Sequence, residues 1–290
     1  NWKYKGLEGF DYQLVKDGDQ IKLGNITLTV VHTPGHTPEH ISFLVQDGAA
    51  ASEPGFILTG DFVFVGDIGR PDLLEEAAGI LGTAEPGARR MFKSLKEKFL
   101  TLPDYVQVWP GHGAGSACGK GLGAVASTTV GYERRFAWWA DYLRTGDEEG
   151  FVKALLSGQP EAPYYFAQMK RLNRDGMPIL GDLKEPHQFT PEQFRQKLAA
   201  GALLVDTRDK LAFAGGHLKG AINIPAGKSF STWAGWLLPY DRDFILLAGP
   251  ERVHELVTQL IRIGLDRVVG YIPSLDGYVQ GELETVPQIT

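Results

Sequence analysis

Hydrophobic and polar positions alternate with a period of two in several short runs between residues 12 and 110. Such alternation is typical of strands with one buried and one exposed face. Turns are expected at Asp17-Gly18-Asp19 and at Gly24-Asn25, because glycine and asparagine tolerate tight backbone geometry. The strands are predicted within residues 12–31 and over residues 41–47, 56–60 and 105–109.

The first half of the chain also contains two predicted helices. Met91, Leu95 and Phe99 recur at a spacing of four, which places them on one face of a helix over residues 88–100. A second helix is expected around residues 130–143. Strands and helices are therefore mixed in this part of the chain, which indicates an α/β fold.

In the last third of the chain, strands and helices alternate. Thr190, Pro191 and Gln193 form the sequence of a capping box that begins a helix, and Gly201 ends it. A further helix is predicted over residues 252–263. Apolar strands are predicted within residues 202–208, 241–249 and 266–272. This alternation is typical of a parallel sheet covered by helices, again an α/β fold.

The change of pattern along the chain predicts two domains. The first is expected over residues 1–144 and the second over residues 187–290. Residues 145–186 contain several prolines and are interpreted as a bridging segment between the domains. A chain of 290 residues is long enough for two hydrophobic cores of ordinary size.

Composition and charge exclude several classes of protein. The chain is 43% hydrophobic and 22% charged, with a net charge of −6, so neither nucleic acid nor an anionic membrane surface is expected as a partner. No apolar run approaches the roughly 20 residues that span a bilayer. The chain has one cysteine, which excludes an internal disulfide and fits a reducing compartment, and we expect the cytoplasm.

The two ends of the chain suggest that the natural protein is longer. The chain begins with Asn1 instead of methionine, and residues 1–30 already have the pattern of the middle of a fold. We therefore expect further residues upstream, together with any targeting peptide. The chain ends at Thr290, where a further domain could follow.

Residues 30–45 contain a loop rich in histidine between two apolar runs. The histidines are four residues apart, but proline and glycine lie between them and exclude a helix: His32, Pro34, Gly35, His36, Pro38 and His40. Asp61 and His112 each follow another predicted strand. Three strand ends thus present His36, Asp61 and His112, and imidazole and carboxylate ligands of this kind suit a first-row metal ion.

Three motifs together resemble the metallo-β-lactamase superfamily, and within it the persulfide dioxygenase branch, over about residues 5–140. They are HTPGHTPEH at residues 32–40, TGD followed by GRPD at residues 59–72, and WPGHG at residues 109–113. The resemblance implies the C-terminal part of an αββα sandwich with His36 and Asp61 as metal ligands. It makes His112 a ligand in the dinuclear hydrolases and a residue that lines the site in the dioxygenases. His32 is interpreted as a strand-end residue, and His40 as a hydrogen-bonding residue that closes the loop.

One motif of this superfamily is absent from the chain. The His-x-His-x-Asp-His loop, which would lie upstream of the motifs above, does not occur in the sequence. Either the chain is a fragment, or it cannot hold the metal in the usual way. We favour the fragment, with a histidine from the upstream segment completing the metal site.

Two metal chemistries, and one role without a metal, remain open. The first is a persulfide dioxygenase with one Fe(II) per chain, which oxidises a thiol persulfide to sulfite and free thiol in sulfide metabolism. The second is a Zn(II) hydrolase of the glyoxalase II type, which cleaves a thioester. The third is a metal-free scaffold. The GRPD motif and the stretch GHGAGSACGKGLG at residues 111–123 resemble the dioxygenase branch and favour the first.

Other residues near these motifs are candidates for the site. Cys118, six residues after His112, is a candidate to contact or exchange with a persulfide, although a small residue filling a loop is an equal alternative. Lys120 and nearby glycine amides are candidates to hold the polar tail of a thiol carrier such as glutathione or coenzyme A. Arg70 and Asp72 are expected to support the metal loop. The stretch is not a phosphate-binding loop, because that motif requires glycine at position 114 and serine or threonine at position 121.

The second domain resembles the rhodanese family over about residues 187–285. The resemblance rests on LLVDTR, with Asp206 and Arg208, and on GGHLKGAINIP, which begins just before His217. The position of the rhodanese cysteine is Leu247 or Ala248, and Pro250 and Glu251 further disturb the anion-binding loop. We therefore expect no rhodanese chemistry, and we expect structural roles for Asp206, Arg208 and His217. The domain is expected to serve in docking, as a lid, or in the assembly of a homo-oligomer, which we expect to be a dimer.

Overall fold

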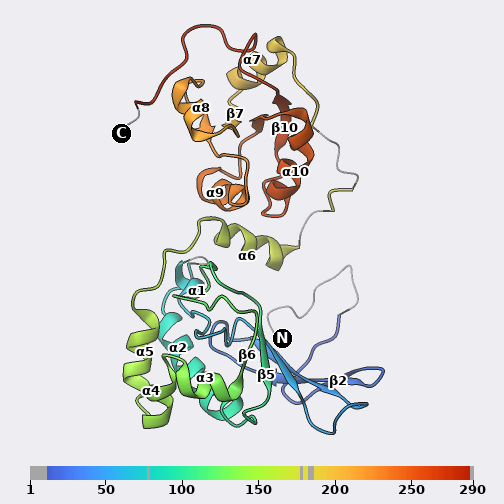
Figure 1. The fold of residues 1–290 in the computed structure, drawn as a ribbon, viewed down its shortest axis with the longest axis vertical. Helices are drawn as coiled ribbons and strands as arrows, with labels where there is room; N and C mark the ends of the chain where they lie inside the picture. Colours follow the sequence, from blue (N-terminus) through green and yellow to red (C-terminus); the bar gives the residue numbers. More distant parts are fainter. Residues whose placement is uncertain (1–11, 77–78, 177–178, 182–185, 288–290) are drawn as a thin grey trace. The chain divides into compact units, whose positions relative to one another are not determined.

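The computed structural model describes residues 12–76, 79–176, 179–181 and 186–287, and Figure 1 shows their arrangement. The chain divides into two compact units between Ala162 and Pro163. This division falls inside the segment 145–186 that the sequence interprets as a bridge. Within the described residues, none of the helices is long and apolar enough to cross a membrane.

The first unit is built on a mixed six-stranded sheet whose strands follow one another in chain order. Neighbouring strands are antiparallel except for β4 and β5, which run parallel. The predicted strands 41–47 and 56–60 are confirmed with the same bounds. The strands are β1 (Gln20–Leu23), β2 (Ile26–His32), β3 (Ile41–Asp47), β4 (Phe56–Gly60), β5 (Gln107–Pro110) and β6 (Thr128–Thr129).

Helices of the first unit lie on one side of this sheet (Figure 1). The helix predicted over residues 88–100 begins earlier, and its last turn, η2, is a π-helix. The helices are α1 (Leu73–Glu76), α2 (Ala84–Ser94), η2 (Leu95–Phe99), α3 (Val130–Phe136), α4 (Ala140–Thr145) and α5 (Glu148–Leu156). The side chain of α5 residue Phe151 belongs to the core of this unit.

The prediction of a single helix over residues 130–143 is wrong, because two helices, α3 and α4, occupy this stretch. The helix is interrupted at Ala137, whose backbone is extended with ψ 143°. No proline or glycine marks this break. The interruption precedes Trp139, whose side chain is completely buried in the core with Phe99. Burial of this large aromatic surface offsets the loss of helical continuity, since a buried aromatic side chain contributes about 1.5–3 kcal/mol.

The core of the first unit lies between the helices and one face of the sheet. Ile57 and Val108 of neighbouring strands are buried with Met91. Alternation along β4 places Phe56 and Leu58 on the opposite face, where they are 38% and 42% exposed. The helix-covered face therefore contains the core of this unit.

The second unit is built on a four-stranded parallel sheet in the order β10-β9-β7-β8. All residues of β7 and β9 are buried, because helices cover both faces, as is usual for parallel sheets. The strands are β7 (Leu203–Asp206), β8 (Ile222–Asn223), β9 (Phe244–Leu247) and β10 (Val268–Ile272). The helices are α6 (Tyr165–Asp175), α7 (Pro191–Ala199), α8 (Lys210–Gly215), α9 (Phe230–Leu237) and α10 (Pro250–Ile261).

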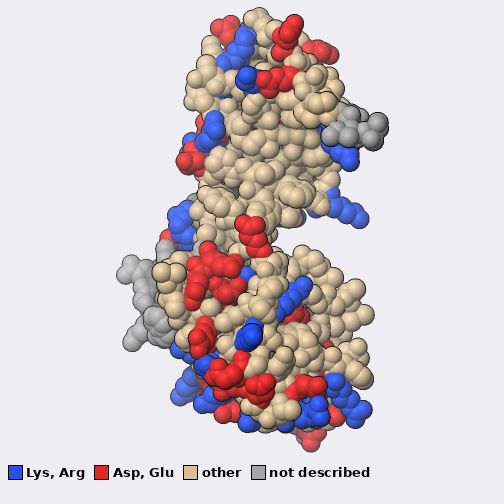
Figure 2. Space-filling model, turned by 90° about the vertical axis from the view of Figure 1, so that its left-hand side faces the viewer, with Lys and Arg blue, Asp and Glu red and all other residues tan. Residues whose placement is uncertain are grey.

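Charged side chains of both signs lie on the face of the molecule shown in Figure 2. On the face shown in Figure 2, Lys and Arg side chains lie among Asp and Glu side chains, and they do not form one continuous basic area. This mixture agrees with the moderate negative charge of the chain. The electrostatic interactions at the candidate site therefore come from its neighbouring side chains.

The start of α7 confirms the capping box expected from the sequence. The Gln193 backbone N–H donates to the Thr190 hydroxyl at 3.3 Å, and the Thr190 N–H donates to the Gln193 side chain at 2.9 Å. Replacing Thr190 by alanine removes the first of these bonds, so we expect Thr190→Ala to lower the free energy of unfolding by about 1 kcal/mol. Amide hydrogen exchange in the first turn of α7 measures this. Thr190→Ser keeps the hydroxyl and serves as the control, and equal exchange in both variants would contradict the capping role.

Candidate metal centre

The histidine loop connects β2 to β3 and is closed by its own side chains. His32 is the last residue of β2, and its ring contacts the carbonyl of Pro38 at 2.9 Å. His40 holds the other end of the loop, because its Nδ1 lies 2.8 Å from the hydroxyl of Thr33 and its Nε2 accepts the backbone N–H of Asp61 at 3.1 Å. His32 and His40 thus occupy the strand-end and loop-closing positions that the sequence predicts.

The tautomer of His40 follows from these contacts. Because Nε2 accepts a hydrogen bond, the proton of the neutral ring is on Nδ1, which donates to Thr33. Burial, together with the neighbouring His36, lowers the pKa of His40 to about 4. His40 is therefore a neutral residue that positions the backbone of Asp61.

His36 lies in the middle of the same loop and points towards Asp61. Its Nδ1 donates to the backbone carbonyl of Arg70 at 2.9 Å, since a carbonyl oxygen can only accept. Its Nε2 is therefore free of a proton in the neutral ring and lies 3.4 Å from Oδ2 of Asp61. The preceding Gly35 packs closely on Met91, where an added Cβ would lie 2.8 Å from the nearest side-chain atom.

Asp61 and His112 are brought together by the parallel pairing of β4 and β5. Gly60 at the end of β4 is paired with Pro110 at the end of β5, so the residues that follow leave the sheet at the same edge. Nε2 of His112 lies 2.9 Å from Oδ1 of Asp61. Burial raises the pKa of Asp61, but His112 and His36 lower it more, and the result is below its usual value. The hydrogen bond to Asp61, with a contribution from Cys118, raises the pKa of His112 to about 10.

Asp61 lies between His36 and His112, with one carboxylate oxygen near each imidazole. The side chains whose ligand atoms all lie within 4.8 Å of one another are Asp61, His112 and Cys118, and His36 reaches this group through Asp61. Two atoms that each lie about 2.1 Å from a metal are about 3.0–3.4 Å apart at octahedral or tetrahedral angles. The carboxylate of Asp61 lies 3.4 Å from one imidazole nitrogen and 2.9 Å from the other. Two imidazoles and one carboxylate also have the chemistry that first-row metals bind. The residues present therefore fit a metal ion.

Cys118 lies next to this group. Its side chain is buried, and the ligand atoms of Asp61, His112 and Cys118 all lie within 4.8 Å of one another. Neighbouring residues hold the loop on either side of the cysteine. Arg70 donates to the carbonyl of residue 117 at 3.2 Å, and the carboxylate of Asp67 accepts the backbone N–H groups of residues 120 and 121 at 2.7 and 3.0 Å.

Lys120 is occupied within the first unit. Its ammonium group donates to the carbonyl of Ala154 and lies 5.2 Å from the ring centroid of Trp138. Trp138 in turn donates its indole N–H to Asp67 at 2.9 Å. The backbone amides of residues 120 and 121 are thus bound to Asp67. A role of Lys120 in holding a thiol carrier remains a prediction.

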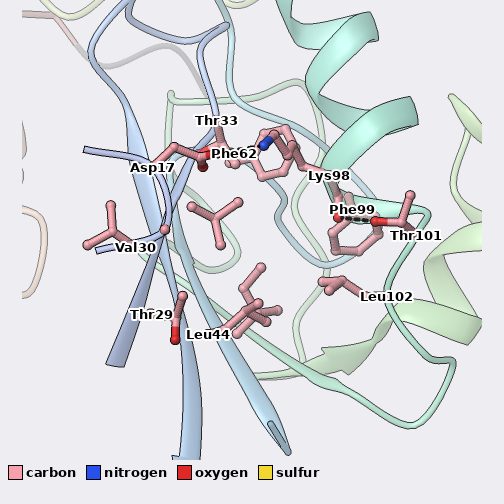
Figure 3. Close-up of a pocket in the computed structure, with 13 residues that line it drawn as sticks. Asp17, Thr29, Val30, Thr33, Leu44, Phe62, Lys98, Phe99, Thr101 and Leu102 are labelled. Atoms are coloured by element: carbon pink, nitrogen blue, oxygen red, sulfur yellow. Dashed lines mark hydrogen bonds and ion pairs between the residues drawn. The ribbon is translucent and has the colours of Figure 1, made fainter. Parts of the chain in front are cut away.

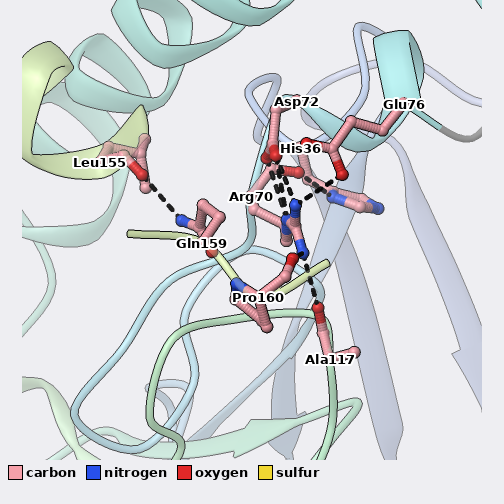
Figure 4. Close-up of polar contacts among 8 residues, drawn as sticks. All are labelled: His36, Arg70, Asp72, Glu76, Ala117, Leu155, Gln159 and Pro160. Atoms are coloured by element: carbon pink, nitrogen blue, oxygen red, sulfur yellow. Dashed lines mark hydrogen bonds and ion pairs between the residues drawn. The ribbon is translucent and has the colours of Figure 1, made fainter. Parts of the chain in front are cut away.

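Arg70 is the most highly connected buried side chain around the site (Figure 4). Its guanidinium is completely buried and forms a bidentate pair with Asp72, and it also pairs with Glu76 at 3.1 Å. It donates to the carbonyl of Pro160 at 2.6 Å. The backbone carbonyl of Arg70 also accepts a hydrogen bond from His36. Arg70 therefore connects the histidine loop, the loop that contains Cys118, and Pro160 near the end of the first unit.

A cavity of about 250 Å³ lies beneath the sheet of the first unit (Figure 3). Its lining is largely apolar, including Leu44, Phe62 and Phe99. Lys98 and Asp17 form an ion pair at 2.8 Å within the lining, and this bond lowers the pKa of Asp17. The cavity lacks the imidazole and carboxylate cluster of the histidine loop, so the loop is the stronger candidate for chemistry.

The rhodanese-like motif residues of the second unit, Asp206, Arg208 and His217, tie β7 to the loop that follows it. Arg208 forms a bidentate pair with the buried Asp206 and donates to the carbonyl of Gly216 at 2.9 Å. The Nδ1 of His217 donates to the carbonyl of Phe213 at 3.0 Å, and the two rings stack. These contacts join the end of β7 to the following loop, and a purely structural role for the three residues stays a prediction.

The loop at the end of β9 does not form an anion-binding cradle. Leu247 and Ala248 are buried, and neither has a nucleophilic side chain. Pro250 occupies the first turn of α10 and offers no N–H, and the carboxylate of Glu251 lies against Gly249. A thiolate or persulfide would therefore be poorly stabilised here.

The polar partners of the loops were not predicted from the sequence. Asp67, Glu76 and Pro160 carry no motif of their own, and their contacts join residues far apart in the chain. The spacing of Glu76 from Arg70 gives no signal, because the two are linked through a turn and the start of a short helix. Knowledge of the loop arrangement is needed to find them.

Comparison with known proteins gives a consistent result for both units. Residues 3–112 match the metallo-β-lactamase superfamily, and residues 190–279 match the rhodanese-like domain. The crystal structure of a metallo-β-lactamase from Staphylococcus aureus is similar over 93% of this chain and 73% of that chain, with 42% identity and a TM-score of 0.78.

Two of the curated relatives are named for different activities. The hydroxyacylglutathione hydrolase GloC of Haemophilus influenzae is 31% identical over 41% of this chain and 43% of that protein. The mitochondrial persulfide dioxygenase of Homo sapiens is 30% identical over 34% of this chain and 32% of that protein. In eight curated relatives, this chain spans less than half of their own length, between 32% and 45%.

The buried position of Arg70 leads to a stability prediction. Lysine in its place cannot reach Asp72, residue 117 and Pro160 together, so Arg70→Lys leaves buried polar groups without partners. We expect a loss of about 3–5 kcal/mol in the free energy of unfolding, measured by denaturant titration. Arg89→Lys is the matched control, because Arg89 pairs with Glu85 and Glu149 on the surface and its loss costs far less. Equal losses in both variants would contradict the role of Arg70.

Proposed function

The chain belongs to the metallo-β-lactamase superfamily, and from this premise we propose that it is an iron-dependent dioxygenase that converts a small thiol persulfide to sulfite and free thiol. The observation that carries the proposal is the convergence of His36, Asp61 and His112 at one sheet edge. Two histidines and one carboxylate with open positions form the donor set of non-haem Fe(II) oxygenases. The match to human persulfide dioxygenase supports this class, and so does the rhodanese-like second unit.

Each residue of the site has a defined part in this proposal. His36 and His112 would hold the metal through Nε2, and Asp61 would hold it through its carboxylate between them. This assignment makes His112 a ligand, whereas the resemblance to the dioxygenase branch implies that it lines the site. The carbonyl of Arg70 fixes the ring of His36, and His40 fixes the backbone of Asp61. Ferrous iron, when bound, supplies the redox chemistry and the open positions for dioxygen and the persulfide.

The reaction balances with dioxygen and water as the co-reactants. The outer sulfur of the persulfide is oxidised to sulfite, dioxygen accepts the four electrons, and water supplies the third oxygen atom. The S–S bond breaks, and the inner sulfur leaves as the free thiol. Cys118, buried within 4.8 Å of the ligand atoms of Asp61 and His112, contacts the persulfide sulfur at this site.

A zinc hydrolase of the glyoxalase II type is the second candidate. The similarity to the hydroxyacylglutathione hydrolase favours it, and histidine and aspartate are also ordinary zinc ligands. In that case, a metal-activated water attacks a thioester carbonyl, and no dioxygen is consumed. The two functions are therefore separated by the metal and by the co-reactant.

The proposal is tested with the gene product prepared without oxygen. Elemental analysis measures the metal, and an oxygen electrode follows uptake with glutathione persulfide and with coenzyme A persulfide. We expect one iron per chain and uptake that depends on persulfide. Asp61→Ala should reduce the rate by about 100-fold or more, because the ligand that lies between both histidines is lost.

His32→Ala is the matched control for these measurements. His32 is the residue from which the same loop starts, and its exposed ring contacts the backbone carbonyl of Pro38. It should leave the iron content and the rate close to those of the unaltered protein. Bound zinc, thioester hydrolysis and no oxygen uptake would show that the protein is the hydrolase. A gene product that binds no metal would favour the role of a metal-free scaffold.

A further inference from the structure

A groove of about 550 Å³ lies in the second unit between the start of α9 and the exposed face of α10. The residues of α10 that line it recur at intervals of three and four, on the face opposite the buried Val253, Leu256 and Leu260. These lining residues are Arg252, Glu255 and Gln259 of α10, and Arg262 and Ile263, which follow directly after the helix, also line the groove. One wall of the groove is therefore a polar helix face.

The opposite wall contains Gly227, Lys228 and Ser231. Gly227 has no side chain and Ser231 has a short one, so this wall leaves space in front of α10. Ser229, which precedes α9, does not cap the helix through its side chain. The positive end of the α9 dipole therefore lies beside the groove, next to Ser231.

Charge in the groove is positive, although the chain as a whole is negative. Three of the lining residues are basic, and Glu255 is the one acidic residue among them. Glu255 accepts from Arg252 at 3.0 Å. Within the part of the chain that the structure describes, neither Lys228 nor Arg262 forms an ion pair with a carboxylate. Two uncompensated cations beside a hollow attract an anion.

The loop at the end of β9, which corresponds to the anion-binding loop of rhodaneses, cannot hold an anion in this chain. At the end of β9, Pro250 removes an N–H and the Glu251 carboxylate occupies the space beside Gly249. The groove has the opposite charge character, because three of its lining residues are basic. Arginine and lysine together with a helix N-terminus are the groups that bind phosphate in proteins.

We propose that this groove binds the phosphate groups of a small molecule. Lys228 and Arg262 contact the phosphate oxygens from opposite walls, and Ser231 and Gln259 offer hydrogen bonds to the rest of the ligand. All lining residues belong to the second unit, so the proposal does not depend on the metal centre or on the proposed reaction.

Isothermal titration calorimetry on the intact chain tests this proposal with inorganic pyrophosphate and with ADP. Binding of both shows that phosphate alone is recognised, and binding of ADP alone shows that the nucleoside is needed as well. Lys228→Ala combined with Arg262→Ala should weaken binding by at least about tenfold, since two charge-assisted contacts are lost. Sulfate at the same ionic strength should bind more weakly than pyrophosphate.

Arg267→Ala is the matched control, because it removes a positive charge from the same unit without touching the groove. Arg267 is paired with Asp243 at 2.7 Å and does not line the hollow. It should leave the affinity for pyrophosphate unchanged. In the unaltered protein, the amide NMR signals of Gly227, Lys228 and Ser231 should shift on addition of pyrophosphate. The absence of binding by both probes, an unchanged affinity in the double variant, or shifts confined to other residues would overturn the proposal.

Discussion

The parallel pairing of β4 with β5 is the constraint on which the candidate site depends. It is the one parallel contact in the six-stranded sheet of the first unit, and it brings the ends of two strands to the same edge. Asp61 is the first residue after β4 and His112 the second residue after β5, and the loop between β2 and β3 adds His36 beside them. Strands paired antiparallel would have sent Asp61 and His112 to opposite edges.

Buried hydrogen bonds convert this approximate convergence into a defined site. Arg70 supports two of the loops with one residue, through its carbonyl to His36 and its guanidinium to the loop of Cys118. Asp67 supports the cysteine loop from the other side. An unpaired buried charge is costly, so each of these residues needs all of its partners, and the loops are fixed together.

Much of the fold and the candidate ligands could be predicted from residue pattern, for physical reasons. Strands 41–47 and 56–60 are bounded by turn residues, and the capping box at Thr190 is a local signal, so these elements need no distant information. The break at Ala137 and the contact between Arg70 and Pro160, ninety residues apart, depend on tertiary packing. The basic groove was also absent from the sequence interpretation, because Lys228 and Arg262 come together only through packing of α9 beside α10.

The central claim is that His36, Asp61 and His112 hold one metal ion together. X-ray absorption at the metal edge of the intact protein tests it directly. Nitrogen and oxygen neighbours at about 2.0–2.2 Å, with the outer-shell scattering of two imidazole rings, are the expected result. That scattering should be reduced in His36→Ala and in His112→Ala. A spectrum without imidazole scattering, or one that neither substitution changes, would contradict the site.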